Sequence, residues 1–261
     1  MMSAGEIIGL AAAAAAAGAV NAVAGGGTLL TFPALLAFGT PALVANATST
    51  LALVIGTAGS VFGYREPIRQ VRPWLQRFIP VSLLGGLLGG ILLTRTDERV
   101  FARLVPFLLL FATFVFLAQG TFRRFAGFAE KNGPAAPHHR AIWAAGLFQF
   151  GVALYGGYFG AGIGILMLAS LGFLGLTDIH EMNGLKTVLG SLINLVAAVW
   201  FIFAGLIDWP RAGVMTVGAL AGYFLGAHYS QRIPQPRVRQ LITAIGLIIS
   251  AALFYQQFGP R

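Results

Sequence analysis

The chain is organised around one pattern that occurs twice. The first copy reads Asn21-Ala-Val-Ala-Gly25-Gly26-Gly27-Thr28-Leu-Leu-Thr-Phe-Pro33 and is followed by the polar cluster Asn46-Ala-Thr48-Ser49-Thr50. The second copy reads Tyr158-Phe-Gly160-Ala-Gly162-Ile-Gly164-Ile-Leu-Met and is followed by Asn183-Gly-Leu-Lys186-Thr187. Each copy places a glycine cluster inside a long apolar run and a polar cluster at the start of the next run. Soluble proteins use glycine loops of this kind for phosphate, whereas the flanks here are typical of a membrane protein.

The composition indicates the class of protein. Of the 261 residues, 57% are hydrophobic and only 10% are charged, and the mean hydropathy is +0.80. These values are far from those of a soluble globular domain. The net charge of +9 comes from basic residues in short loops between apolar runs, which indicates cytoplasmic loops rather than a nucleic-acid surface. The absence of cysteine excludes disulfides and thiolate metal sites.

Two apolar runs are too long for a single perpendicular span. The run 7–38 is apolar apart from Gly25–Gly27, and the run 141–174 is apolar apart from Gly160–Gly164. A straight helix as long as the first run would measure about 48 Å, against a hydrocarbon core of about 30 Å. Each run therefore either tilts strongly or breaks at its glycines and turns back. Because the N-terminal run has no basic flank and continues into the first copy, we interpret it as a membrane segment rather than a cleaved signal peptide.

The two copies belong to a duplication of the whole chain. Gly25 aligns with Gly162, Asn46 with Asn183 and Thr50 with Thr187, all at an offset of 137 residues. The shared order and spacing of these matches predict two homologous membrane repeats. The predicted organisation is a first repeat at 1–122, a cytoplasmic linker at 123–140 and a second repeat at 141–261.

The distribution of arginine bears on the topology. Three segments, 65–77, 123–140 and 232–239, are basic, and the positive-inside rule places all three in the cytoplasm. A simple count of spans puts the third on the opposite side from the second. The conflict disappears if each long run enters and leaves the membrane as two arms. We therefore predict an all-α polytopic fold of two inverted repeats, each with a broken or re-entrant first helix.

These residues resemble the sulfite exporter TauE/SafE family over nearly the whole chain. The resemblance is carried by Gly25-Gly26-Gly27 with Pro33 and Gly39-Thr-Pro41, and most specifically by Gly157-Tyr-Phe-Gly-Ala-Gly162-Ile-Gly164 with Asn183-Gly-Leu-Lys186. It implies a bacterial inner-membrane transporter for sulfite, sulfonates or related small anions. The second copy lacks a counterpart of Pro33 and has Leu185-Lys186-Thr187 where the first has Thr48-Ser49-Thr50. We therefore expect the two halves to contribute unequally to a site.

The residues themselves also indicate anion binding. A helix that restarts after a break exposes backbone N–H groups with positive dipole character, and glycine lets an anion approach them closely. We expect a small anion between the two breaks, held by these groups and by polar side chains of the next helices. The predicted substrate-binding residues are Gly25, Gly26, Gly27, Asn46, Thr48, Ser49, Gly160, Gly162, Gly164, Asn183 and Lys186. Asn21, Tyr158 and Asn194 are further polar candidates, while Gly86, Gly90, Gly218, Gly222 and Gly226 are assigned to helix packing.

Lys186 is the most informative single residue. It begins an apolar run about one turn after Asn183, so its ammonium could pair with an anionic substrate or carry a coupling proton. The alternative is a lysine that extends to the membrane interface. His180-Glu181 resembles half of a zinc-protease motif, but Gly184 occupies the second histidine position, so this site is rejected.

A secondary transporter is the preferred function. An anion channel and an integral membrane enzyme remain as alternatives, although four histidines and eight acidic residues leave little for a catalytic cluster. No Walker motif is present, and we expect no cofactor, no metal and no nucleic acid. The expected partners are a small anionic substrate, the lipid bilayer and, as an open alternative, a second copy of the chain in a homodimer.

Overall fold

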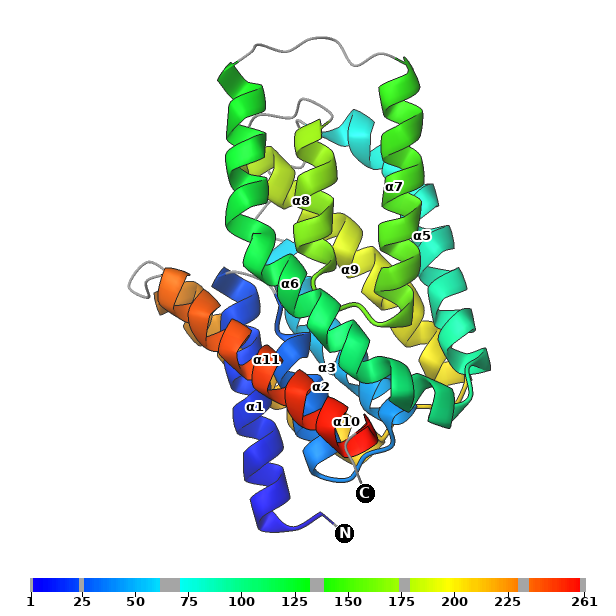
Figure 1. Ribbon diagram of the computed structural model, residues 1–261, viewed down its shortest axis with the longest axis vertical. Coiled ribbons are helices and arrows are strands. Elements are labelled where there is room, and N and C mark those ends of the chain that lie inside the picture. Colours follow the sequence, from blue (N-terminus) through cyan, green and yellow to red (C-terminus); the bar gives the residue numbers. More distant parts are fainter. Residues whose placement is uncertain are drawn as a thin grey trace.

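The computed structural model describes residues 2–23, 26–61, 71–131, 139–173, 179–229 and 235–258. Within these ranges the regular secondary structure is entirely α-helical (Figure 1). The first part of the chain contains α1 (Ala4–Val23), α2 (Thr28–Ala37), α3 (Ala42–Val61), α5 (Arg72–Arg95) and α6 (Glu98–Lys131). The second contains α7 (His139–Tyr158), α8 (Ile163–Phe173), α9 (Ile179–Phe203), α10 (Trp209–Tyr229) and α11 (Gln235–Phe258).

Several helices extend beyond the apolar runs that predict them. The apolar runs 78–93 and 187–206 predict spans that begin at Phe78 and Thr187. In the structure, α5 begins at Arg72 and α9 begins at Ile179. Helix α6 continues to Lys131, into the segment predicted as a linker. Charged residues are good helix formers and can extend a membrane helix into the polar interface, so hydropathy alone underestimates helix length. The sequence that follows Lys131, Asn132-Gly133-Pro134, is typical of a helix end.

One end of the bundle collects the ends of helices that are far apart in the sequence. The Glu98 carboxylate, at the start of α6, accepts hydrogen bonds from the N–H groups of Ala42 and Leu43 at the start of α3. The Trp200 indole near the end of α9 donates to Thr94 near the end of α5. Both chain termini also lie in the lower part of Figure 1. Helices α3 and α6 thus start at this end of the bundle, whereas α5 and α9 finish there. Such alternation of helix directions is expected when successive helices cross a membrane.

Glycines set the closest helix crossings. On α10, Gly218, Gly222 and Gly226 face the backbone of α1 at Ala11, Ala15 and Ala19, one step of four residues at a time. Side chains at these glycines would collide with that backbone. The glycines of α5 play the same part, with Gly85 and Gly89 against α7 and Gly86 against α9. The packing role predicted for the regularly spaced glycines is thus confirmed.

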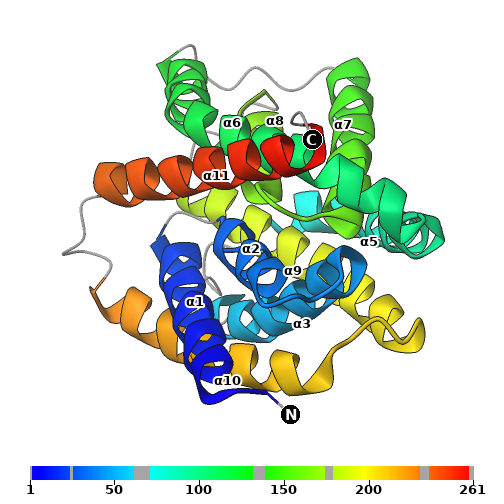
Figure 2. The ribbon, with the colours of Figure 1, turned by 60° about the horizontal axis from the view of Figure 1, so that its bottom comes forward.

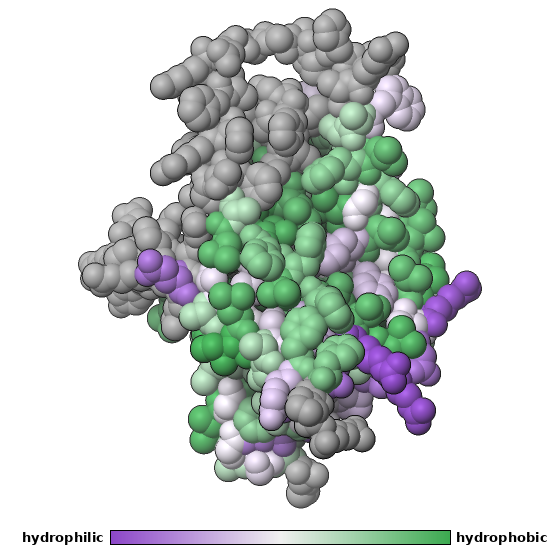
Figure 3. Space-filling view, viewed as in Figure 1, coloured by the Kyte–Doolittle hydropathy of each residue, from purple (hydrophilic) through white to green (hydrophobic). Residues whose placement is uncertain are grey.

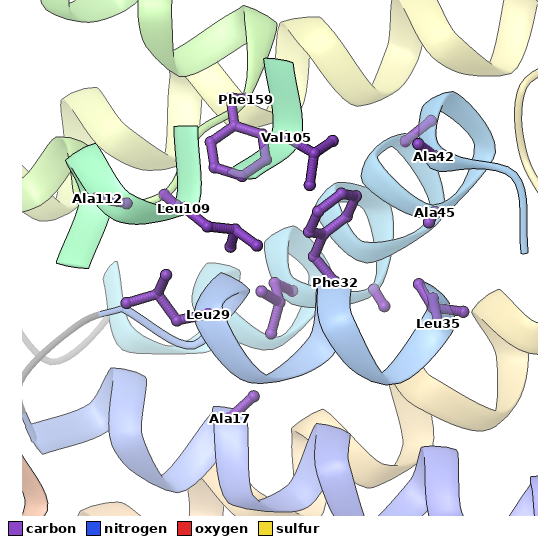
Figure 4. Packing of buried hydrophobic residues seen from close by; sticks show 14 of the residues in the cluster. Ala17, Leu29, Phe32, Leu35, Ala42, Ala45, Val105, Leu109, Ala112 and Phe159 are labelled. Atoms are coloured by element: carbon purple, nitrogen blue, oxygen red, sulfur yellow. The ribbon is translucent and has the colours of Figure 1, made fainter. Parts of the chain in front are cut away.

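The core lies between α2, α3 and α6. Figure 4 shows Phe32 of α2, Leu109 of α6 and Phe159 after α7 pointing toward one another. Helix α2 is enclosed by α1, α3 and α6, and Figure 2 shows α11 lying across α6 on the outside of this group. The short helix α2 is therefore surrounded by longer helices rather than by lipid.

The outer surface is strongly apolar. Four helical segments are long and apolar enough to cross a membrane: Ala4–Asn21, Arg72–Arg95, Glu98–Ala118 and Glu181–Phe203. Large hydrophobic side chains such as Phe107, Phe114 and Leu147 are exposed. On the face in Figure 3, hydrophobic residues cover most of the middle, and hydrophilic residues lie toward the edges. A surface of this kind is stable against lipid rather than water, so the fold is that of a multi-pass membrane protein.

Candidate functional site: the turn between α7 and α8

The connection between α7 and α8 is a glycine turn. Helix α7 ends at Tyr158 and α8 begins at Ile163. Gly160 and Gly162 have φ angles of +83° and +81°, a backbone conformation that residues with a side chain rarely adopt. The Tyr155 hydroxyl donates to the Ala161 carbonyl at 2.9 Å and holds the turn against α7.

This turn leaves backbone donors unpaired at the start of α8. The first amide of α8 with a backbone partner is that of Ile165, which donates to the Gly162 carbonyl at 3.0 Å. Among the described residues, the N–H groups of residues 161–164 donate to no other group. Unpaired N–H groups at a helix start attract negative charge.

Lys186 lies against this helix start. Its Cδ and Cγ atoms would be 3.2 and 3.4 Å from a Cβ on Gly164, so the glycine makes room for the lysine stem. Its Nζ donates to Asn183 Oδ1 at 3.0 Å, and both residues are half-buried. The structure thus brings together three of the predicted site residues, Gly164, Asn183 and Lys186.

Two asparagines meet the other side of the turn. Asn46, which is 1% exposed, reaches across from α3 and donates from Nδ2 to the Tyr158 carbonyl at 3.0 Å. Asn194 Oδ1, on α9, lies 3.5 Å from the position that a Cβ on Gly160 would take. Asn46, Gly160 and Asn194 are therefore grouped at the carboxyl end of α7.

The turn between α1 and α2 is more completely paired. Gly26 has a φ of +94°, and the Gly27 N–H donates to Asn21 Oδ1 at 2.7 Å. A Cβ on Gly26 would lie 2.9 Å from the Phe116 ring. An asparagine thus already occupies the donor that an anion would need, while Gly25 lies outside the described residues.

The hydroxyl candidates of α3 also have protein partners. Thr48 Oγ1 accepts a hydrogen bond from the Asp208 backbone N–H at 3.1 Å. Ser49 Oγ lies 2.6 Å from Thr31 Oγ1 on α2. Both residues are fully buried. The structure therefore separates Thr48 and Ser49 from Lys186 and places them in contacts that join α3 to neighbouring segments.

Both glycine turns pack against the same part of α6, but the space between them is apolar. Gly26 faces Phe116, and Gly162 faces Val115. The rings of Phe32 and Phe159 meet between the turns with centroids 5.4 Å apart. Polar contacts are instead found on the side of the second turn that faces α9 and α3.

Some polar groups were not identified from the sequence. Tyr155 is a tyrosine within an apolar run and carries no motif. Arg211 of α10 forms ion pairs with Glu6 of α1 and with Asp208. Glu6 is distant from Arg211 in the sequence, and Asp208 lies in the short loop before α10, so no sequence pattern indicated these pairs.

The titratable residues that precede Lys186 in the sequence are only partly described. Glu181 is half-buried, whereas Asp178 and the side chain of His180 lie outside the described part of the chain. Within the described part of the chain, no group of three His, Cys, Asp or Glu residues could hold a metal ion.

The fold and the apolar surface define a multi-pass membrane protein, with a glycine turn and a half-buried lysine at the start of α8. A family model described as Sulfite exporter TauE/SafE matches residues 10–253. The chain belongs to this family of membrane transporters, as its motifs predicted.

Curated relatives cover nearly the full length. The chain is 29% identical over 246 residues to "Probable membrane transporter protein" of Haemophilus influenzae, covering 91% of this chain and 90% of the relative. It is 25% identical to "Probable membrane transporter protein YfcA" of Escherichia coli K12, covering 94% and 88%. It is 27% identical to "Probable membrane transporter protein ORF9" of a Sinorhizobium species, covering 92% and 88%. No solved structure gives a significant match.

Proposed function

We propose that the protein is a secondary transporter that moves a small anion, such as sulfite or a sulfonate, through a site at the start of α8. The carrying observation is that the N–H groups of residues 161–164 have no partner among the described residues and that the Lys186 stem packs against the last of these residues, Gly164. Lys186 supplies positive charge, and Asn183 orients its ammonium.

Electrostatics explains why these groups suit an anion. An anion that leaves water loses hydration, and this cost is large unless fixed donors and charge replace it. Backbone N–H groups and a lysine provide charge-assisted hydrogen bonds of this kind. The turn after α1 offers fewer donors because Asn21 already binds the Gly27 N–H. The second turn is therefore the binding turn in this proposal.

A pair of inverted repeats would provide the moving parts. Under the duplication, α1 corresponds to α7 and α5 corresponds to α10. In the structure, α1 packs on α10 and α7 packs on α5. These two contacts correspond to each other under the duplication, because each joins the first helix of one half to a helix of the other half. Each half then offers a helix that ends at its glycine turn, α1 or α7, and a short returning helix, α2 or α8. Rocking of these two halves about a central site is the usual mechanism of such transporters.

The orientation follows from the basic segments. The exposed Arg72 and Arg77 lie at the start of α5, at the end of the bundle opposite Glu98 and the start of α3. With this basic end in the cytoplasm, both termini face outward. For a bacterial protein of this family, the proposed location is the inner membrane.

A flux assay tests the proposal. The purified protein is reconstituted into proteoliposomes, and uptake and release of sulfite, sulfate, taurine and chloride are measured with and without a pH gradient. Saturable transport of sulfite or a sulfonate, with counterflow of the labelled anion, is expected. Fluxes equal to those of empty liposomes for all four anions would contradict it, and flux that does not saturate and shows no counterflow would indicate a channel.

A further inference from the structure

We propose that a sodium ion binds at the carboxyl end of α7, held by Asn46, Asn194 and the final carbonyl groups of the helix. The inference extends the proposed function by naming the coupling ion. The sodium site and the anion site would lie on opposite sides of one glycine turn.

Asn46 supplies the first observation. Its Nδ2 donates to the Tyr158 carbonyl, which fixes the orientation of the side-chain amide. Its Oδ1 is fully buried and has no hydrogen-bond partner among the described residues. A buried amide oxygen without a partner is unfavourable and rare, so a bound ligand is expected to interact with this oxygen.

Gly160 supplies an independent observation. Within the described part of the chain, a Cβ at this glycine would meet two atoms within 4 Å outside its chain neighbours, and both are oxygens. They are the Gly156 carbonyl oxygen at 3.1 Å and Asn194 Oδ1 at 3.5 Å. The absence of a side chain at Gly160 therefore lets two acceptor oxygens lie close to the turn.

The end of α7 adds negative character to this space. The Phe159 and Gly160 N–H groups both donate to the Tyr155 carbonyl. As a result, the Gly156 carbonyl receives no backbone hydrogen bond among the described residues. Unpaired carbonyls at a helix end carry partial negative charge, and the ends of interrupted membrane helices are suited to bind sodium.

The chemistry of the group favours sodium over other occupants. The atoms assigned to the site, Asn46 Oδ1, Asn194 Oδ1 and the Gly156 carbonyl oxygen, are neutral acceptors, and acceptor oxygens favour a cation over an anion. Amide and carbonyl oxygens do not titrate near neutral pH, so they do not carry a coupling proton. Without a carboxylate among these ligands, a divalent ion would lack the charge it usually requires. A small monovalent cation fits these properties.

The two sites are linked through the turn. Asn194 lies two turns of α9 beyond Lys186, roughly 12 Å along the helix axis. Opposite charges at this separation in a site of low dielectric attract each other, so each ion strengthens binding of the other. The combined gradients of the two ions then determine the direction of net flux.

Sodium binding is measured directly on the purified protein. Thermal unfolding is followed in NaCl, KCl and choline chloride at constant ionic strength, and equilibrium binding of radioactive sodium is measured in parallel. We expect NaCl to raise the Tm of the unmodified protein in a saturable manner. Equal Tm values in NaCl and choline chloride, with no bound sodium, would overturn the proposal, and equal stabilisation by KCl would overturn the assignment to sodium.

Variants locate the site. Asn194→Leu removes one ligand oxygen and should raise the half-saturating sodium concentration at least about tenfold, and Asn46→Ala should do the same. Thr243→Val is the matched control, because Thr243 of α11 also has a buried oxygen without a partner but lies on another helix. If Asn194→Leu has the same half-saturating sodium concentration as the unmodified protein, this location of the site is excluded.

Transport separates this inference from the proposed function. If sulfite flux is saturable and independent of sodium and no sodium binds, the sodium site is wrong and the anion transporter stands. If sodium stabilises the protein but no anion is transported, the sodium site stands and the anion assignment is wrong.

Discussion

The two parts of the Lys186 side chain have different surroundings. The carbon stem packs on Gly164, and the ammonium donates to Asn183. A lysine that only extends to the interface needs neither a glycine beside its stem nor an amide partner within the bundle. The contacts therefore support the interpretation of Lys186 as a substrate ligand.

We predict that Lys186→Met weakens anion transport strongly. The change keeps the length of the side chain and removes its charge. The loss of a hydrogen bond to a charged group costs about 1.5–3 kcal/mol, which lowers the affinity for the anion about 10- to 150-fold. The measurement is the concentration dependence of anion flux in proteoliposomes. Lys186→Arg keeps the charge and should retain part of the affinity. If Lys186→Met reaches the membrane normally and transports at the unmodified rate, Lys186 is not part of the site.

Substitution of the turn glycines should affect the two halves unequally. Gly162→Leu places a side chain at a positive φ against Val115 of α6, so it should distort the turn, displace the N–H groups proposed to bind the anion and weaken anion binding. Gly26→Leu meets Phe116 and should reduce transport mainly through packing. Gly151→Leu on α7 is the control, since a Cβ there meets no atom of the described residues within 4 Å. Anion affinity and the amount of folded protein are measured for each variant. Full activity of both turn variants would exclude a glycine-turn anion site.

At the scale of one helix, α9 carries a polar stripe. Asn183, Thr187, Ser191 and Asn194 are half-buried and recur at steps of three or four residues. This spacing places them on one face, whereas the exposed Val199 lies on another. A polar face inside an apolar bundle is the expected lining of a pathway for ions.

Cysteine accessibility tests the stripe, and the chain has no native cysteine to remove. Single cysteines at Thr187 and Ser191 should react with a water-soluble thiol reagent, because water reaches a transport pathway. A cysteine at Val199 should react slowly, because lipid covers that face. Saturating anion should protect Thr187→Cys. Equal and slow reaction at all three positions would show that the stripe serves only helix packing.

The contact between α1 and α10 depends on backbone proximity. Gly222 lies so close to the Ala15 carbonyl that no side chain fits. We therefore predict that Gly222→Leu lowers the free energy of unfolding by about 2 kcal/mol or more. Gly213→Leu on the same helix is the control, because a Cβ there would have no neighbour within 4 Å in the part of the chain that the structure describes. Thermal unfolding in detergent measures both variants, and equal Tm values would contradict the close crossing.

At the scale of the whole molecule, two ends of the bundle differ in charge. The described residues of the basic segments, 71–77, 123–131, 139–140 and 235–239, lie at the start of α5, the end of α6, the start of α7 and the start of α11. We predict that cysteines at Gln76, Arg124 and Gln235 are labelled only from the cytoplasmic side and a cysteine at Gln257 only from outside. External labelling at Arg124 would reverse the orientation. Labelling of Gln76 and Gln235 from opposite sides would contradict the inverted repeats.

The sequence by itself determined the class of protein and its family. Apolar runs of membrane length and few charges predict a polytopic helical protein, because backbone polar groups must be paired within each segment in lipid. The glycine motifs and their spacing predicted the TauE/SafE family, which the family match confirms. Helix ends were less well predicted, as α5, α6 and α9 show, because a helix can continue past its apolar residues into the polar interface.

The tertiary structure alone decided which polar groups meet. Asn46 and Ser49 are close in the sequence, yet Asn46 pairs with Tyr158 and Ser49 pairs with Thr31. Asn21 binds the first glycine turn, whereas the N–H groups of the second, near Lys186, find no partner in the described ranges. A residue's type shows what it can donate or accept, but its partner depends on which distant helix packs beside it. That choice is made by close glycine crossings and by the filling of the core, which no local pattern contains.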